Sequence, residues 1–422
     1  MNKIIALVLA GGRVGELGPL TYYQPKSAVP FGGLYRVIDF PLSNLMHSGI
    51  EIAGILSQYR SSSLIKHIGI GAAWDFVGRK RGIVMLPPFK GASAADWYNG
   101  TADAVAQNLD FIHQNDPQLV LILSGDHIYK MDYQPLIDYH LQKDADLTIV
   151  FKKVMPEESA RFGMARLDDE DDETGGKVIE YFEKSTQATV PWASLTIYLF
   201  KTAALFDILK KAQKNTRLFE FGKDIIPQML GEFKVYGYKF DGYWGYTRTL
   251  TEYWQTNMDI LDTPGKIDLK NWEVRTNLAN RQIRDRCPAR ILEHAKIKNS
   301  LFYHGCKIDG VVNHSILFPG VRVGKSAHIS DSLIMFDVYI SEGARIENAI
   351  IASDTVIGKG VVIGAQASEV GISASDNRAL TVIGEGCRIP ESMIIEQGCV
   401  IYPFRQEEHF PGQRIKAGDE IK

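Results

Sequence analysis

Two glycine-containing turns stand directly after apolar runs that could form neighbouring strands. Gly11-Gly12 follows the run Ile4–Leu9, and Gly125-Asp126 follows the run Leu119–Leu123. Glycine leaves no Cβ between backbone N–H groups and an anionic ligand. Parallel sheets bind ligands beyond the carboxyl ends of their strands, so we expect both turns to meet at one edge. The glycine pair by itself is equally compatible with a plain tight turn.

The elements that must position these turns alternate over the first 260 residues. Short apolar runs predict strands at Ile4–Leu9, Ile52–Leu56, Leu119–Leu123, Leu147–Phe151, Met164–Leu167 and Ile197–Phe200. Longer amphipathic stretches predict helices at Asp103–Gln114 and Tyr133–Gln142. Strands that alternate with helices indicate crossover connections and a mostly parallel mixed sheet in an α/β domain.

The last 130 residues follow a different rhythm. Branched apolar residues recur every five or six positions, at Val312, Leu317, Val323, Ile329, Ile334, Ile340, Ile346, Ile351, Ile357 and Ile363, and again at Ile383, Ile389, Ile394 and Val400. This hexapeptide period is typical of a parallel β-helix, in which each triangular coil directs one branched residue inward from each of three flat faces. Residues 365–381 interrupt the series, and we expect a loop there.

Length and charge bound the remaining possibilities. The 422 residues divide into an α/β domain (1–262), a linker (263–290) and a β-helix domain (291–422). With 47 basic against 50 acidic residues, the net charge of −3 disfavours nucleic-acid binding through a broad basic face. No apolar run is long enough for a membrane helix, and we expect a cytoplasmic protein. We expect reduced, buried thiols at Cys287, Cys306, Cys387 and Cys399.

Several longer motifs extend the first glycine turn into a continuous pattern. They include 17–21 (LGPLT), 25–33 (PKSAVPFGG), 36–44 (RVIDFPLSN), 97–105 (WYNGTADAV), 124–133 (SGDHIYKMDY), 182–184 (FEK) and 221–227 (FGKDIIP). This pattern resembles the sugar-nucleotide pyrophosphorylases, and within them the ADP-glucose pyrophosphorylase (glucose-1-phosphate adenylyltransferase) family. The resemblance spans nearly the whole chain. It implies a Rossmann-like nucleotidyltransferase domain followed by a left-handed parallel β-helix.

The resemblance also implies a reaction and a set of site residues. In that family, glucose 1-phosphate attacks the α-phosphorus of ATP and displaces pyrophosphate, so catalysis consists of positioning and charge neutralisation. By analogy, Lys26 contacts phosphate and Asp126 ligates Mg²⁺. The nucleotide would lie against Leu9, Ala10, Gly11, Gly12, Gln58, Gly100 and Thr101. Glucose 1-phosphate would lie against Tyr98, Gly163, Glu183, Lys184 and Ser194.

Three positions depart from the family pattern where phosphate and metal are handled. Val14 replaces the third glycine of the loop, where a positive φ would be strained. Glu16 replaces the arginine expected beside the leaving pyrophosphate, so a carboxylate stands where a cation is needed. Tyr246 replaces the aspartate that is the second Mg²⁺ ligand, and a phenol is a poor ligand at pH 7. Thr196 also replaces a usual glycine.

Three functions therefore compete. The first is a non-catalytic regulatory subunit in glycogen or starch biosynthesis, which joins a catalytic homologue in a homo- or hetero-tetramer and retains ATP, ADP-glucose or glucose 1-phosphate binding. The second is an active adenylyltransferase, dependent on Mg²⁺, in which Arg13 or Arg248 covers for the lost groups. The third is a hexapeptide-repeat acyltransferase, which would need one of His304, His314 and His328 as a general base.

Overall fold

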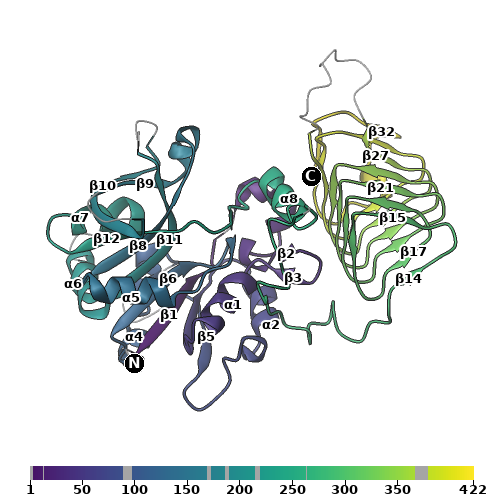
Figure 1. The fold of residues 1–422 in the computed structure, drawn as a ribbon. Coiled ribbons are helices and arrows are strands. Elements are labelled where there is room, and N and C mark those ends of the chain that lie inside the picture. The colour runs from purple at the N-terminus through teal and green to yellow at the C-terminus, as the bar shows by residue number, and fades with distance from the viewer. Residues whose placement is uncertain are drawn as a thin grey trace. The chain divides into compact units, whose positions relative to one another are not determined.

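A computed structural model describes residues 3–12, 14–88, 97–168, 173–185, 190–213, 219–262, 264–365 and 379–422. The chain forms two compact units (Figure 1). The first unit comprises 1–12, 40–61 and 68–244. The second unit comprises 13–39, 62–67 and 245–422. Residues 13–39 and 245–262, although they precede the predicted domain boundary, are therefore grouped with the β-helix.

The first unit is built on a nine-stranded mixed sheet. Its strands follow the order β5 (Gly82–Leu86), β4 (Ile52–Leu56), β1 (Ile4–Leu9), β6 (Leu119–Ser124), β11 (Trp192–Lys201), β8 (Leu147–Lys153), β12 (Val235–Lys239), β10 (Gly175–Glu183) and β9 (Gly163–Leu167). Strands β5, β4, β1 and β6 are mutually parallel. Beyond β6 the sheet is mainly antiparallel, with β8 and β12 as a parallel pair. The prediction of a mixed sheet in an α/β domain is confirmed, but the sheet is not mostly parallel, because five of the nine pairings among its described strands are antiparallel.

The described helices are α1 (Asp39–His47), α2 (Ser62–Ile68), α3 (Thr101–Ala106), α4 (Leu109–Asn115), α5 (Gln134–Gln142), α6 (Thr202–Gln213), α7 (Ile226–Met229) and α8 (Leu250–Met258). Two helices were predicted, and the predicted helix Tyr133–Gln142 corresponds to α5 except for its first residue. The predicted helix Asp103–Gln114 is split between α3 and α4. The split falls at Asn108, whose backbone is not helical. Its side chain donates to the Tyr98 hydroxyl and to the Ala104 carbonyl, and such local side-chain bonds compete with a regular helix.

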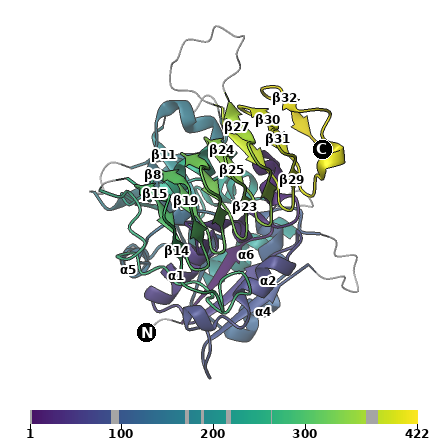
Figure 2. The same cartoon turned by 90° about the vertical axis from the view of Figure 1, so that its right-hand side faces the viewer.

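The β-helix has three faces, each a sheet of parallel strands to which every coil contributes one strand (Figure 2). The first face contains β14 (Arg290–Ile291), β17 (Lys307–Ile308), β20 (Arg322–Val323), β23 (Tyr339–Ile340), β26 (Val356–Ile357) and β29 (Arg388–Ile389). The second face contains β15 (Lys296–Lys298), β18 (Val311–Asn313), β21 (His328–Ser330), β24 (Arg345–Glu347), β27 (Val362–Ala365), β30 (Ile394–Glu396) and β32 (Arg414–Ile415). The third face contains β16 (Leu301–Phe302), β19 (Ile316–Leu317), β22 (Leu333–Ile334), β25 (Ala349–Ile351), β28 (Thr381–Ile383), β31 (Val400–Ile401) and β33 (Glu420–Ile421).

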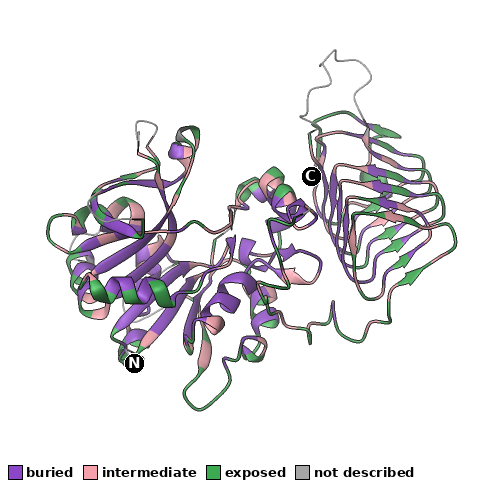
Figure 3. Ribbon diagram, viewed as in Figure 1, coloured by how far each residue is buried: buried purple, intermediate pink, exposed green. Residues whose placement is uncertain are grey.

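The inward series fills the centre of the coils, as Figure 3 shows by its buried positions. Every predicted inward residue from Val312 to Ile389 is buried. The predictions at Ile394 and Val400 are wrong by one position, because Ile395 and Ile401 are the buried residues. The steps after the interruption are six residues each, and Ile363 pairs with Ile395 just before a register shift between Ile363 and Ala365. The interrupting segment 366–378 lies outside the described residues.

The third face is apolar on its outer side as well. The outward residues Ile316, Leu333, Ile350 and Val382 are fully buried. Within the second unit, segment 13–39 and α8 contact neighbouring parts of the coils. The Tyr303 hydroxyl donates to the Gly32 carbonyl at 2.6 Å, and Trp254 Nε1 donates to the Asp331 carbonyl at 2.9 Å.

Gly33 shows how closely this segment approaches the β-helix. Its φ is +93°, and a Cβ there would overlap the ring of Tyr303. Glycine is therefore required at this position both by its backbone conformation and by the ring packed against it.

The short elements of the chain complete the description. A hairpin of β2 (Pro30–Phe31) and β3 (Tyr35–Arg36) and a 3₁₀ segment, Gly15–Thr21, belong to the second unit, and β7 (Ile128–Tyr129) and β13 (Trp244–Gly245) are two-residue strands. No described helix is long and apolar enough to cross a membrane. All four cysteines are free thiols, as expected. Cys306, Cys387 and Cys399 are buried, but Cys287 is exposed, contrary to the prediction, because it precedes the first coil.

Candidate functional site

The sheet edge in the first unit brings the two glycine turns together, as the sequence predicts. The Gly125 amide donates to the Leu9 carbonyl at 2.9 Å, and the Ala10 amide donates to the Leu56 carbonyl at 2.9 Å. A Cβ on Gly11 would lie 3.0 Å from the Gln58 backbone nitrogen, so the glycine permits close approach of the turns after β1 and β4. Gly12 has open space around its Cα. This edge presents backbone groups from three parallel strands to one side of the sheet.

Gln58 and Tyr98 hold each other in place beside this edge. The Tyr98 amide donates to Gln58 Oε1 at 2.8 Å, and Gln58 Nε2 donates to the Tyr98 carbonyl at 3.3 Å. The Tyr98 ring is buried, and its hydroxyl donates to the Leu86 carbonyl and accepts from Asn108 Nδ2. Burial raises the pKa of this phenol. Tyr98 therefore remains a neutral group that fixes the backbone at 98–101.

Gly100 and Thr101 are anchored by a carboxylate that the sequence analysis did not single out. The Thr101 hydroxyl donates to Glu220 Oε2 at 2.7 Å and accepts from the Phe221 amide at 3.0 Å. A Cβ on Gly100 would overlap the Phe219 carbonyl. The start of α3 is thus locked to the turn before α7. Glu220 could have been suspected because it directly precedes the Phe-Gly-Lys motif.

Of the predicted sugar-phosphate residues, Gly163 and Lys184 lie beside the Glu183 carboxylate, whereas Tyr98 bonds to Gln58, the Leu86 carbonyl and Asn108 instead. Tyr181 donates to Glu183 Oε2 at 3.2 Å, and Lys184 Nζ lies 3.8 Å from Oε1. A Cβ on Gly163 would overlap the Tyr181 hydroxyl, and one on Gly222 would overlap Glu183 Oε2, so both glycines leave room for this pair. Gly222 is a further site residue that the sequence analysis did not assign. Burial raises the pKa of Glu183, while the Lys184 ammonium, more than half exposed, opposes that shift.

Ser194 lies near this cluster on a bulge of β11. The pairing of β11 with β8 shifts between Ser194 and Tyr198, and the bulge includes Thr196 at φ +55°. The Ser194 hydroxyl accepts from the Thr196 amide at 3.4 Å. Burial raises the pKa of Tyr198 to about 12, and the Ser194 side chain opposes that shift. A β-branched residue with positive φ is strained, and the glycine usual at this position would not be. The bulge nevertheless retains the serine in position.

Asp126 is the remaining polar residue of this edge. Its Oδ1 accepts a hydrogen bond from Ser124 Oγ and lies 3.3 Å from His127 Nε2. In the described ranges, no group of three or more His, Cys, Asp or Glu side chains could hold a metal ion. Asp126 can supply one carboxylate to a phosphate-bound Mg²⁺, but the phenol of Tyr246 does not fit the second ligand position of the family. The residues present therefore do not fit a two-carboxylate magnesium site.

The departures from the family pattern form a cluster of their own within the second unit. Arg248 Nη2 and Nε lie 2.9 and 3.0 Å from Glu16 Oε1, and Arg248 Nη1 donates to the Tyr246 hydroxyl at 3.2 Å. Hydrogen bonds from the backbone and from Arg248 lower the pKa of Glu16. The hydrogen bond with Tyr246 raises the pKa of Arg248, and the ion pair with Glu16 adds a smaller contribution in the same direction. The two new side chains, Glu16 and Tyr246, are therefore linked through a third, Arg248.

Lys26 and Val14 complete this cluster. The Lys26 ammonium lies 5.2 Å from the centroid of the Tyr246 ring, which is a cation–π distance. Val14 has φ −109° and ψ +104°, ordinary extended backbone, so the strain expected for a valine in the glycine loop is absent. Its carbonyl accepts from the Leu17 amide and the Thr21 hydroxyl, which fixes the turn without a positive φ. Arg13, the other arginine considered as a replacement for the missing cation, lies outside the described residues.

Comparison with known proteins decides the family. The nucleotidyl transferase family matches residues 5–263, and the GlmU-like C-terminal hexapeptide family matches residues 287–374. A glucose-1-phosphate adenylyltransferase of Thermotoga neapolitana is 40% identical over 100% of this chain and 99% of its own length. This chain belongs to the glucose-1-phosphate adenylyltransferase family. Another member, from Geobacillus stearothermophilus, is 43% identical over 77% of this chain and 83% of its own length.

The three histidines considered as a general base for acyl transfer make only surface or coil-to-coil contacts. His304 and His328 are exposed, and His328 Nδ1 contacts the Ser326 carbonyl at 3.0 Å. His314 Nδ1 pairs with Asp331 Oδ1 at 2.7 Å, which ties two successive coils together. These contacts are those of surface and structural side chains.

Proposed function

We propose that this chain is a subunit of a glucose-1-phosphate adenylyltransferase that binds glucose 1-phosphate but catalyses adenylyl transfer poorly. The assembly would also contain a catalytic homologue, and its reaction would supply ADP-glucose for glycogen or starch in the cytoplasm. The observation that carries the proposal is the engagement of Arg248 by Glu16 and Tyr246. In the family, the arginine at position 16 stands beside the leaving pyrophosphate. Here the pair of Arg248 and Glu16 is neutral.

The cost of this arrangement follows from the chemistry. As a glucose 1-phosphate oxygen bonds to the α-phosphorus of ATP, the bond to pyrophosphate breaks and negative charge accumulates on the departing oxygen. A preorganised cation stabilises that charge, and the loss of one such group typically costs about 10²–10³-fold in rate. Glu16 places a negative charge where the family has the arginine. Because Tyr246 stands in place of the family's aspartate, the chain also lacks the second carboxylate ligand for the metal. Mg²⁺ would supply Lewis-acid charge neutralisation when bound, with Asp126 as its protein ligand.

The binding half of the proposal depends on a different set of residues. Glu183, Lys184 and Ser194 retain the chemistry that a sugar phosphate requires, namely a carboxylate for hydroxyl groups, a cation for phosphate and a neutral hydroxyl. Glycines at 163 and 222 keep the carboxylate accessible to its partners. These features support retained binding of glucose 1-phosphate.

One assay tests the proposal. Pyrophosphate release from ATP and glucose 1-phosphate with Mg²⁺ is measured for the purified chain, and glucose 1-phosphate binding is measured by calorimetry on the same preparation. We expect binding without appreciable turnover, and stimulation of turnover only when a catalytic homologue is added. Turnover by the chain alone at a rate ordinary for enzymes, about 10 s⁻¹, would contradict the proposal.

The second candidate is an active enzyme with rearranged charges. It is favoured by the presence of Arg248 within bonding distance of position 16, since a guanidinium that left Glu16 could serve a phosphate. The same assay distinguishes the two, because this candidate requires turnover without a homologue.

A further inference from the structure

A hollow within the second unit lies between the segment 19–30 and one corner of the β-helix. Its volume is about 340 Å³, and part of that space is open to solvent. The segment contributes Leu20 and Gln24 to its lining, and the coils contribute Met335, Ala352, Ser353 and Glu385. An apolar lining with a few polar groups is the usual composition of a small-molecule site. The hollow is therefore a candidate binding site.

Glu385 brings a charge to a corner of the coils that is otherwise uncharged. Strand register on the third face places Glu385 at the same corner as Phe336 and Ser353 of the two preceding coils. Phe336 is buried, and Ser353 is only 6% exposed. Glu385 is partly exposed and lines the hollow. The preceding coils thus fill this corner with neutral side chains, whereas the coil of Glu385 presents a carboxylate.

This carboxylate is incompletely stabilised by the chain. It accepts no hydrogen bond and forms no ion pair with any residue that the structure describes. Arg36 attracts it, but the Arg36 guanidinium is bonded to the Ala28 carbonyl and to Gln282 Oε1. Burial raises the pKa of Glu385, the charge of Asp354 adds to the rise, and Arg36 opposes it. A cation in the hollow would compensate the charge of Glu385.

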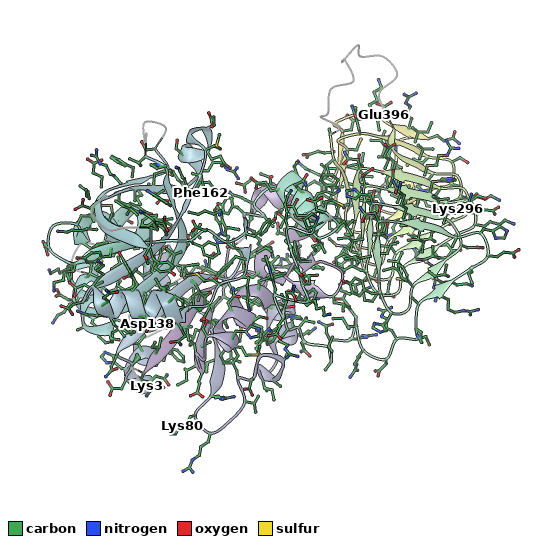
Figure 4. The ribbon with its side chains drawn as sticks, viewed as in Figure 1. Lys3, Lys80, Asp138, Phe162, Lys296 and Glu396 are labelled. Atoms are coloured by element: carbon green, nitrogen blue, oxygen red, sulfur yellow. The ribbon has the colours of Figure 1, made fainter. Side chains whose placement is uncertain are left out.

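A second glutamate of the β-helix shows the more common arrangement. Glu396, labelled near the upper coils in Figure 4, is buried. Its carboxylate accepts from Arg414 Nε at 2.7 Å and from the Ala417 amide at 2.9 Å. Partly or fully buried carboxylates ordinarily have such partners, because an unpaired one costs free energy. Glu385 lacks an equivalent donor in the described chain, so its donor would have to come from outside.

Two neutral acceptors accompany Glu385 in the lining. The Ser353 side chain, nine-tenths buried, makes no hydrogen bond with a described residue. Gln24 Nε2 donates to the Leu20 carbonyl at 3.1 Å, and no described residue donates to Gln24 Oε1. A carboxylate, a hydroxyl and an amide oxygen therefore line one hollow with acceptor capacity left over. A ligand with several N–H donors matches this set.

We propose that the hollow binds the ammonium group of a small organic amine, with Glu385 as counter-ion and with Ser353 and Gln24 as acceptors. An ammonium group has three donors and no acceptor. The carbon atoms next to it would contact Leu20 and Met335. A metal ion such as Ca²⁺ or Mg²⁺ takes roughly six or more oxygen ligands, which this lining does not offer. An anion would be repelled by Glu385. The inference is independent of whether the chain turns over substrate.

Butylammonium chloride is a suitable probe, because it joins an ammonium group to a short apolar chain. Its binding to the full-length chain is measured by calorimetry and by the shift in thermal melting. We expect saturable binding, and at least about tenfold weaker binding to Glu385→Gln, because the substitution removes a charge-assisted bond. Glu391→Gln, at an exposed glutamate of the same β-helix, is the matched control and should bind as the parent does. Ser353→Ala should weaken binding by a smaller factor, about threefold.

The outcomes separate the possible ligands. Equal affinities of the parent and Glu385→Gln for butylammonium, or no saturable binding up to about 10 mM, would overturn the proposal. So would tighter binding of sodium butyrate or inorganic phosphate, since the hollow would then select an anion. Displacement of butylammonium by a lower concentration of magnesium chloride would also overturn it, because a metal ion would be the ligand.

A folding control keeps the test decisive. Without amine, Glu385→Gln should melt no earlier than the parent, because the carboxylate makes no bond that the substitution would break. If it does melt earlier, Ser353→Ala decides the question, and an affinity of that variant equal to the parent's would overturn the proposal.

Discussion

The predicted site residues of the first unit and those of the second unit have changed in different ways. In the first unit, the residues around Glu183 keep the family pattern, and their hydrogen bonds and glycine contacts hold a carboxylate, an ammonium and a hydroxyl together. In the second unit, Glu16 and Tyr246 replace the family residues, and both bond to Arg248. The comparison indicates that charge on the phosphate-handling segment can be rearranged without loss of packing, because these side chains are partly exposed.

The largest effect is expected from restoring the family residues in the second unit. Val14→Gly, Glu16→Arg, Tyr246→Asp and Arg248→Gly together should raise the rate of pyrophosphate release by on the order of 10²-fold or more. Arg248→Gly belongs in the set because an arginine at 16 would otherwise stand beside a second guanidinium. The control, Val14→Gly with Arg248→Gly, leaves Glu16 and Tyr246 and should gain nothing. Equal rates for the two variants would contradict the comparison.

Removal of the cation in the first unit should affect binding. Lys184→Ala deletes the ammonium that would pair with the sugar phosphate, and charge-assisted bonds of this kind correspond to roughly 10- to 100-fold in affinity. Calorimetry with glucose 1-phosphate measures the effect, and Lys177→Ala, an exposed lysine on β10, is the matched control. Equal affinities for both variants would show that this half no longer binds the ligand.

The pH dependence of that binding is expected to follow Glu183. Burial raises the pKa of its carboxyl above the ordinary value of 4.5, so the acceptor for sugar hydroxyls becomes protonated at a higher pH than an exposed glutamate would. Affinity should be full well above the raised pKa and should fall as the pH is lowered through it. Glu183→Gln should bind weakly with little dependence on pH. A parent whose affinity is constant down to the ordinary pKa would count against this role.

A smaller effect, on stability, is expected at Thr196, which replaces a usual glycine in the first unit. Thr196→Gly should raise the free energy of unfolding by about 1 kcal/mol, since a non-glycine residue in the left-handed region is strained. Thr196→Ala keeps the positive φ and should show no such gain. Denaturant unfolding of both variants measures the difference, and greater stability of the alanine variant would show that the bulge is not strained.

The smallest effect is expected from loss of the ion pair between Glu16 and Arg248 in the second unit. Glu16→Gln should change the free energy of unfolding by less than about 1 kcal/mol, because both partners are more than a third exposed. The lowered pKa of Glu16 means that its contribution is present above the pKa of the unfolded chain and is lost as the pH falls through the folded value. Unfolding at pH 7 and at pH 3 checks the sign, and a larger difference at pH 3 would refute it.

The sequence by itself determined most of the local structure. Strands β1 and β4 begin and end at the predicted residues, because short apolar runs bounded by glycine or polar residues have few alternatives. The β-helix register was predictable as far as Ile389, since a period of five or six residues admits one inward series. The substitutions Glu16 and Tyr246 were visible as departures from the family pattern.

Only the tertiary structure decided which distant residues meet. No spacing along the chain indicates that Glu220 anchors Thr101, that Gly222 makes room for Glu183, or that Tyr303 packs on Gly33, because these contacts join segments far apart in sequence. The inward residues Ile395 and Ile401 depended on whether the step after Ile389 is five or six residues, which the mixed period does not decide. Val14 was expected to be strained by its residue type, but the bonds to its carbonyl set its backbone. Arg248 was considered from the sequence as a replacement cation, but only the folded structure showed that its guanidinium pairs with Glu16.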